Sequence, residues 1–275
     1  MDEIKLVPGT DPALLYRSFT PLEVIHEGRD HRQAFSATQA SFQLLRSALN
    51  LEALGRYTIQ IGRPNPLGRV RVPPVSGIFR ESGDLAGYYY EENPPHSYSR
   101  PRLAERTLMR AERLLRELRH ARSGRTTLGL IEDAIEKYGK ALDTTNWSEA
   151  FLCLWQVLEL LTHDPDGKYS MDEVCKRAKI LLRQHPLLAD LLDVCYVTRN
   201  RLVHAGRFAE EGLRDVQMLK KIVEVCIATT YGLRRACPTR ESLFTYYRLA
   251  SVSNNELEVQ SRVISHIKRI RQRAT

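Results

Sequence analysis

The sequence predicts a mainly α protein, in which a helical bundle follows an N-terminal α/β extension. Apolar residues recur at helical spacing through most of residues 101–236. The β-rich segments are short, lie within 55–92 and are separated by glycine and proline. An apolar content of 43% with 27% charged residues is typical of a globular protein, and 275 residues suffice for a substantial core.

Residues 1–125 are predicted to form the N-terminal extension. Its first helix is expected from about Asp30 to Leu54, with Gly55 as the stop signal. Short strands are expected at 57–61, 70–72, 76–79 and 86–90, because these segments are rich in β-branched and aromatic residues between turn residues. Together they predict a small antiparallel β segment.

An arginine-rich amphipathic helix is expected across residues 101–122, at the end of the extension. Residues 100–125 contain nine arginines against three glutamates. Leucines occupy one face, and the opposite face carries the candidate RNA-binding residues Arg102, Arg106, Arg110, Arg113 and Arg116. Arginine in preference to lysine suits phosphate recognition. The alternative interpretation is a solvated charged face without a ligand.

Residues 126–236 are predicted to form the helical bundle, and 237–275 a C-terminal basic helical arm. Apolar spacing predicts helices over about 128–142, 147–161, 171–184, 186–205 and 216–227. Asn146 and Glu149 have the spacing of a capping box before the second of these helices. The bundle is nearly neutral, whereas residues 254–275 carry five basic and two acidic side chains.

The helix that begins near Pro186 carries the candidate catalytic residues Arg199, Asn200 and His204. Arg199 shares its face with Leu188, Leu192, Cys195 and Leu202, so it stands where a leucine is expected. A partly buried arginine needs an acceptor or a charge partner, for which Glu159 is best placed. Tyr196 lies with Asn200 and His204 on a neighbouring stripe at spacings of four, so Glu159 and Tyr196 are candidate supporting residues.

In this helical context, Arg199–His204 resembles the Arg-x(4–6)-His motif of HEPN domains, and the chain is most similar to the ApeA-like HEPN group. The resemblance is clearest over residues 126–236. It implies a HEPN-like helical bundle and a metal-independent endoribonuclease. It also implies a homodimer, in which two motifs meet to form one composite site, and a role as a bacterial toxin or antiviral defence effector.

Metal-independent RNA cleavage needs groups of the kind that this motif offers. The 2′-OH of the substrate attacks the adjacent phosphate while a base and an acid transfer protons. Histidine suits proton transfer near neutral pH, arginine suits the phosphate, and Asn200 can orient either group. The alternative is a non-catalytic module that binds RNA, a nucleotide or a partner protein. In that case Arg199 pairs with Glu159 structurally, and His204 merely occupies a helix C-terminus, where cations are favoured.

Neither a cofactor nor a metal is expected, because the histidines have no zinc-ligand spacing and no nucleotide-binding fingerprint occurs. The expected partners are RNA, a second copy of the chain, and an antitoxin or sensor protein encoded nearby. No apolar run is long enough to span a membrane, and the N-terminus does not resemble a signal peptide. Five cysteines without a Cys-x-x-Cys pair further favour a cytoplasmic protein.

Overall fold

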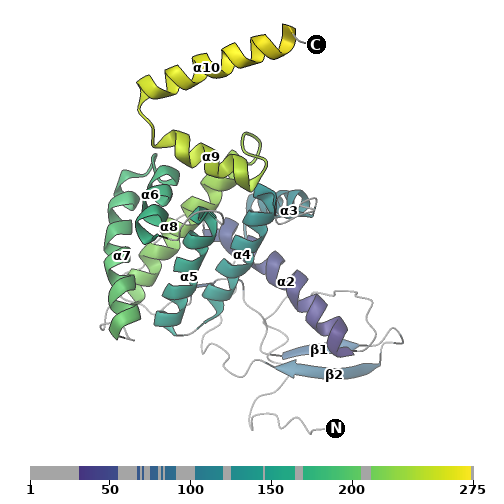
Figure 1. The fold of residues 1–275 in the computed structure, drawn as a ribbon. Helices are drawn as coiled ribbons and strands as arrows, with labels where there is room; N and C mark the ends of the chain where they lie inside the picture. The colour runs from purple at the N-terminus through teal and green to yellow at the C-terminus, as the bar shows by residue number, and fades with distance from the viewer. Residues whose placement is uncertain are drawn as a thin grey trace. The chain divides into compact units, whose positions relative to one another are not determined.

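The computed structural model is mainly helical, as the sequence predicts, and the chain divides into two compact units, Met1–Leu115 and Arg116–Thr275 (Figure 1). The structure describes residues 31–54, 67–68, 70, 75–79, 82, 84–90, 103–119, 125–144, 146–164, 170–205 and 212–273.

The first unit contains one long helix and a pair of strands. Helix α2 spans His31–Leu54, and strands β1 (Val75–Phe79) and β2 (Leu85–Tyr90) pair antiparallel, with an irregularity between Ile78 and Phe79. The side chain of Asn50 exchanges two hydrogen bonds with the backbone of Val70, at 2.8 and 2.9 Å. These bonds tie Val70 to the last turns of α2. The strands expected at 57–61 and 70–72 lie outside the described residues, apart from Val70.

Helix α3 spans Glu105–Leu118, so it is shorter than the predicted 101–122. Ala111, Leu114 and Leu118 are buried on its apolar face, whereas Leu108 is exposed. The predicted leucine face is therefore only partly covered.

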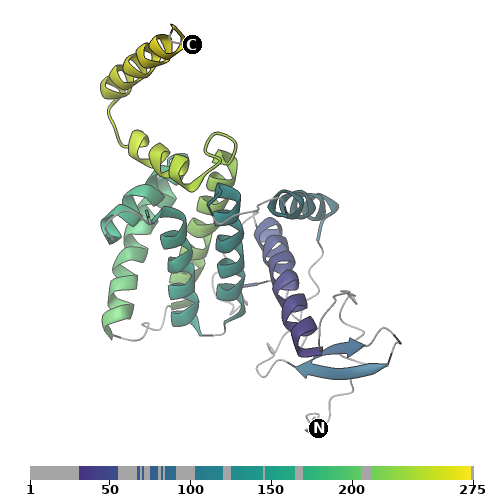
Figure 2. The same ribbon diagram turned by 45° about the vertical axis from the view of Figure 1, so that its right-hand side comes forward.

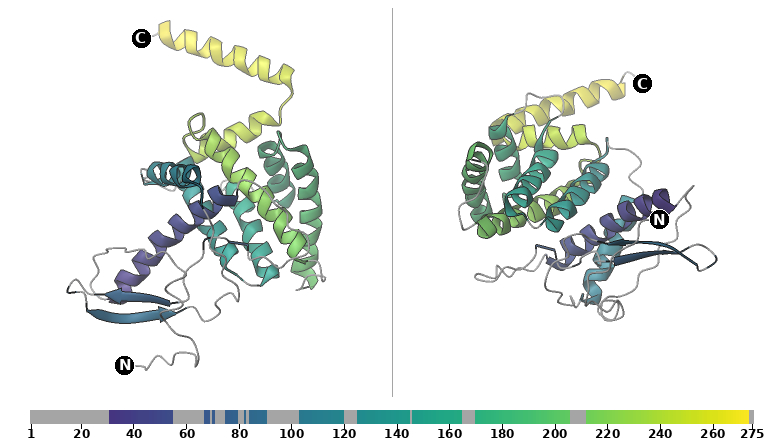
Figure 3. Two further views of the ribbon diagram at one scale, coloured as in Figure 1. Left: turned by 180° about the vertical axis from the view of Figure 1, so that it is seen from behind. Right: turned by 90° about the horizontal axis from the view of Figure 1, so that it is seen from below.

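The second unit consists of consecutive helices joined mostly by short connections, and all but the last of them form the bundle (Figures 1 and 2). They are α4 (Thr127–Asp143), α5 (Trp147–Thr162), α6 (Met171–Leu181), α7 (Pro186–Ala205), α8 (Gly212–Leu233), α9 (Arg240–Ala250) and α10 (Asn254–Arg273). Helix α8 contacts α4, α5, α6 and α7, and Figure 3 shows it running across these helices. The bundle predicted from apolar spacing is thus present.

Helix α5 is the central element of the bundle core. Its apolar residues Phe151, Leu154, Trp155 and Leu158 are buried against the surrounding helices. Burial of each such side chain stabilises the fold by about 1.5–3 kcal/mol. Asn146 caps the helix as predicted, since its side-chain oxygen accepts hydrogen bonds from the Ser148 and Glu149 amides at 2.9 and 3.3 Å.

A buried polar cluster joins α4 to α8. The Tyr138 hydroxyl donates a hydrogen bond to the Glu224 carboxylate at 2.6 Å, and Lys220 forms an ion pair with the same carboxylate. The Lys220 ammonium also lies 5.8 Å from the centre of the Tyr138 ring. Burial, followed by the nearby Glu224 charge, raises the pKa of Tyr138 well above its usual value. The phenol therefore stays protonated and serves as a fixed donor between the two helices.

Helix α9 belongs to the bundle, although the sequence assigns it to the C-terminal arm. Its Leu243, Phe244 and Tyr247 are buried, and the Tyr247 hydroxyl donates to the Leu161 carbonyl at 3.2 Å. An isolated β-bridge between Thr126 and Thr239 ties its start to that of α4. The sequence predicted helical structure for 237–275, but it could not show that this apolar face packs back on the bundle.

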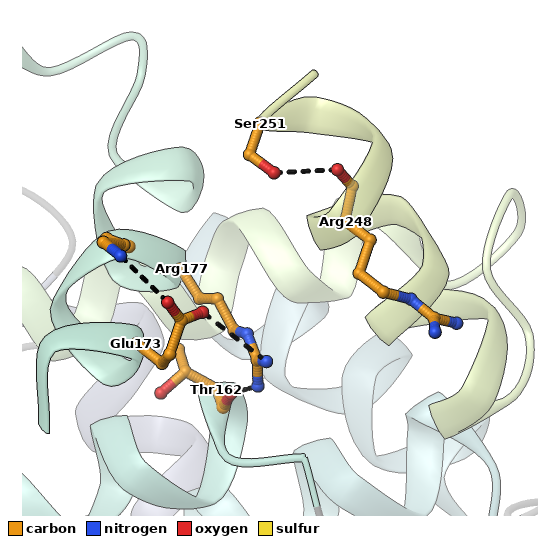
Figure 4. Close-up of polar contacts among 6 residues, drawn as sticks. Thr162, Glu173, Arg177, Arg248 and Ser251 are labelled. Atoms are coloured by element: carbon orange, nitrogen blue, oxygen red, sulfur yellow. Dashed lines mark hydrogen bonds and ion pairs between the residues drawn. The ribbon is translucent and has the colours of Figure 1, made fainter. Parts of the chain in front are cut away.

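One arginine, Arg177, connects α5, α6 and α9, and Figure 4 shows its contacts with Thr162 and Glu173. Arg177 donates a hydrogen bond from Nη1 to the Thr162 carbonyl at 2.8 Å, and its Nη2 lies 3.7 Å from the Glu173 carboxylate. Its guanidinium also lies over the Phe244 ring, 5.5 Å from the centre. Figure 4 further shows Ser251, whose hydroxyl donates to the Arg248 carbonyl at 2.8 Å at the end of α9. These contacts make Arg177 part of the packing between helices.

All five cysteines carry free thiols, and all except the half-buried Cys153 are buried. Burial raises the pKa of Cys175 to about 11 and that of Cys195 to about 12. These two thiols are therefore protonated and unreactive at neutral pH. Within the described part of the chain, no helix is both long enough and apolar enough to cross a membrane.

Candidate functional site

Helix α7 carries the candidate catalytic residues, and its bounds, Pro186–Ala205, match the prediction. Leu192, Cys195 and Leu202 are buried on one face, as the helical repeat predicts. Arg199 belongs to the same face but is only half-buried. An arginine at this position keeps its guanidinium at the boundary between the core and the solvent.

Two acceptors lie close to the Arg199 guanidinium. Nη2 is 4.0 Å from Oε1 of Glu159 on α5, and Nη1 donates a long hydrogen bond of 3.5 Å to Oδ1 of Asn200. The side chains of Arg199 and Glu159 are 23% and 22% exposed. Nε of Arg199 is buried and has no hydrogen-bond partner among the described residues. The guanidinium is thus oriented by weak contacts that leave donor capacity unused.

His204 lies in the last turn of α7, about 6 Å along the helix axis from Asn200. Asn200 is half-buried and the His204 side chain is exposed. Within the described residues, no hydrogen bond or ion pair joins His204 to Arg199 or Asn200. The imidazole therefore faces solvent, where a ligand can reach it. Gly206, the predicted stop signal, lies outside the described residues.

Tyr196 is half-buried and packs inward on Trp155 of α5. The ring centres are 6.2 Å apart with an interplanar angle of 27°, and Phe151 extends the stack at 6.5 Å from Trp155. The indole N–H of Trp155 is buried without a hydrogen-bond partner in the described part of the chain. The sequence places Tyr196 on the polar stripe with Asn200 and His204. In the structure its ring also packs between α7 and α5.

Sequence reasoning did not identify Trp155 as part of this site. The apolar spacing of α5 assigned it to the core, where it is in fact buried. Thr198 was also missed; its hydroxyl donates to the Asp215 carboxylate on α8 at 3.3 Å. Neither contact has a local signature, because each joins helices that are distant in sequence.

The outer side of α7 presents apolar residues beside the motif. Leu187, Val194 and Val197 are exposed, and so are Arg201 and His204. Intervals of seven, three, four and three residues place all five on one stripe of the helix. His204 therefore lies at the end of an uncovered, partly apolar helix face, which the sequence analysis did not single out.

Four of the five candidate RNA-binding arginines lie on α3 and are exposed: Arg106, Arg110, Arg113 and Arg116. Arg102 lies outside the described residues. Arg110 is 4.0 Å from the Glu52 carboxylate of α2. Burial raises the pKa of Glu52, and the Arg110 charge opposes that rise. These arginines form a basic helix face on α3.

Among the described residues, no group of three or more His, Cys, Asp or Glu side chains is arranged to hold a metal ion. In comparisons with protein-family models, curated proteins and solved structures, none matches this chain. The arrangement on α5 and α7 is therefore interpreted from its own chemistry: an oriented guanidinium, an adjacent amide, and an exposed imidazole one turn away.

Proposed function

We propose that this protein is a metal-independent endoribonuclease of the HEPN type, cleaving RNA through attack by the substrate 2′-OH. One observation carries the proposal: the half-buried Arg199 guanidinium lies near Glu159 and Asn200, and the exposed His204 lies one helical turn beyond Asn200. A phosphate that approaches the end of α7 meets a cation and a group able to transfer protons.

Each residue has a role in this reaction. Arg199 binds the scissile phosphate and stabilises the negative charge that develops on it. His204 transfers a proton, either from the 2′-OH or to the leaving 5′-oxygen. Asn200 orients the guanidinium or the substrate, while Glu159 and Tyr196 hold the arginine and its helix in position.

A second copy of the chain completes the proposed site. One imidazole and one guanidinium do not supply a base, an acid and a phosphate cation at once, whereas two motifs facing each other do. The exposed Val194 and Val197 support this arrangement, because pairing of two α7 helices would bury them beside His204. The composite site then lies across a two-fold axis.

The proposed substrate and setting follow from the same chemistry. The exposed arginines of α3 are suited to the RNA backbone. An enzyme that cleaves cellular RNA needs control, so we place it in the cytoplasm as a toxin or antiviral defence effector. An antitoxin or sensor protein encoded nearby would restrain or trigger it.

A second candidate function is a non-catalytic module that binds RNA, a nucleotide or a partner protein. The ion pair between Arg199 and Glu159 favours it, since such a pair can serve the packing of α5 and α7 alone. In that case His204 has no chemical role, and its replacement leaves binding unchanged.

The test is cleavage of total RNA by the purified protein in the presence of a chelator. We expect fragments that end in 2′,3′-cyclic phosphate, because the 2′-OH is the nucleophile. His204→Ala should lower the rate by about 100-fold or more, the usual contribution of a proton-transfer group. His185→Ala is the matched control, since this exposed histidine lies just before the opposite end of α7.

Equal rates for His204→Ala and the wild-type protein would remove His204 from the reaction. RNA binding without any cleavage would favour the non-catalytic module. Fragments that end in 3′-hydroxyl would point to a different nucleophile.

A further inference from the structure

Helix α10 (Asn254–Arg273), yellow in Figure 1, has exposed side chains along almost its whole length. Its large apolar residues are between 44% and 55% exposed: Val259, Val263, Ile264, Ile267 and Ile270. In proteins, most of the stability of an amphipathic helix comes from packing of its apolar face against a neighbour. The helix therefore presents a face that lacks a partner within the described residues.

The apolar residues of α10 form one continuous stripe. Val259, Val263, Ile267 and Ile270 follow one another at intervals of four, four and three residues, and Leu257 and Ile264 extend the stripe on one side. This repeat is the one that packs helices side by side. Five of the six residues are β-branched, which suits the interlocking core of a helix pair.

The charges of α10 are divided between its two ends. Glu256 and Glu258 lie near the start, and no carboxylate follows them in the helix. The remainder carries the basic residues Arg262, Lys268, Arg269, Arg271 and Arg273. Two parallel copies would place the basic ends together. In an antiparallel pair, the acidic end of each copy lies beside the basic end of the other.

We infer that α10 pairs antiparallel with α10 of a second copy of this chain. The pair buries the stripe between the two helices and neutralises charge at both ends. It is a symmetric contact, in which the same surface is used by both copies. The inference goes beyond the proposed ribonuclease activity and does not rest on it.

Other partners fit this helix less well. A helix that lies on an anionic membrane is usually rich in Trp, Phe or Leu on its apolar face, whereas this stripe consists of valine and isoleucine apart from Leu257. Arg271 would also enter the bilayer surface beside Ile267 and Ile270. RNA would engage the arginines but would leave the isoleucines exposed to water. Only a second helix with the same pattern satisfies both the apolar stripe and the divided charge.

The first measurement is the self-association of the full chain by sedimentation equilibrium. Ile264→Asp combined with Ile267→Asp should raise the dissociation constant at least tenfold, because two buried contacts become charged. Ser261→Asp combined with Ser265→Asp is the matched control. It adds the same charge on the polar side of α10, so association should change little.

Charge reversal then tests the antiparallel order. Glu256→Lys with Glu258→Lys, or Arg271→Glu with Arg273→Glu, should each weaken association about fivefold, as expected for a few exposed ion pairs. The dissociation constant of the chain with all four changes should return to within about threefold of the wild-type value, because the two ends of α10 are complementary again. A parallel pair would show no such recovery.

Each variant is also compared in a Val197→Asp background, which separates α10 from any contact through α7. If Val197→Asp alone abolishes RNA cleavage while the α10 effects persist, the two contacts are independent. If the ribonuclease proposal fails, the α10 result still stands. Three results would overturn the inference. The Ile→Asp substitutions could leave association unchanged in both backgrounds, or the wild-type chain could be strictly monomeric. The variant with all four charge changes could also fail to regain its affinity. The inference would also fail if Ile264 and Ile267 were required for binding to phosphatidylserine vesicles but not for self-association.

Discussion

Arg199 occupies a position on α7 where the helical repeat predicts a leucine. The neighbours on that face, Leu192, Cys195 and Leu202, are buried, whereas Arg199 reaches the edge of the core and approaches Glu159. An ion pair at such an edge is partly screened by water, so its contribution to stability is small. A leucine at this position would bury more apolar surface, so the arginine breaks the local packing pattern for little gain in stability.

At the residue scale, Arg199→Lys separates the catalytic role from the structural one. Lysine keeps the charge but lacks the planar fork that reaches both Glu159 and Asn200. We expect the free energy of unfolding to change by less than about 1 kcal/mol, and RNA cleavage to fall at least about tenfold. Chemical denaturation and the chelator assay measure the two effects, with the exposed Arg183→Lys as the control. Lower stability with unchanged cleavage would assign Arg199 to packing alone.

At the element scale, α7 and α3 present different kinds of surface. Helix α7 combines a buried face, a motif at its edge and exposed valines, whereas α3 exposes a row of arginines above buried Ala111 and Leu114. Arg106 and Arg113, two turns apart, share one side of α3. That spacing allows contacts with successive phosphates of one strand.

The double variant Arg106→Gln and Arg113→Gln tests the role of α3. If both guanidiniums contact phosphates, the salt dependence of single-stranded RNA binding should become shallower by about 1.4 units of log K per log salt. Fluorescence anisotropy at several salt concentrations measures it. Arg183→Gln with Arg235→Gln removes the same charge from exposed positions on the other unit and should leave the slope nearly unchanged. An unaltered slope in the α3 variant would favour a merely solvated face.

At the scale of the whole molecule, the proposed activity depends on association of two chains. Helix α7 offers exposed valines beside His204, and α10 offers a second apolar stripe. An isologous contact through α7 would place two copies of each proposed catalytic residue near one axis. Activity should then depend on protein concentration wherever the dimer dissociates.

Mixing a His204→Ala protein with an Arg199→Ala protein tests the shared site. Each alone should be nearly inactive, whereas about half of the dimers in an equilibrated mixture combine one variant of each kind. The mixed dimer regains one phosphate cation and one proton-transfer group but lacks the full acid and base pair. We therefore expect the mixture to cleave RNA about tenfold faster than either variant, yet well below the wild-type rate. Circular dichroism on each variant checks that both are folded. A protein that is strictly monomeric in solution yet cleaves RNA at the full rate would contradict the composite site.

The sequence by itself determined the helical class, the bounds of α7 and the unusual position of Arg199. Amphipathic repeats and caps such as Asn146 are local signals, because each depends on residues within a few turns of one another. The choice of Glu159 as the arginine partner also came from the sequence, and the structure places its carboxylate 4.0 Å away.

Only the tertiary structure decided which helices meet. In the folded chain, α9 packs on the bundle through Tyr247, and Tyr196 stacks on Trp155. Tyr138 donates a hydrogen bond to Glu224, which is 86 residues away in the sequence. The structure also showed that Val194 and Val197, which the sequence pattern does not single out, are uncovered. The physical reason is that an apolar side chain gains the same free energy from any apolar neighbour. A periodic pattern therefore predicts that a face is to be covered, while the chain topology decides what covers it.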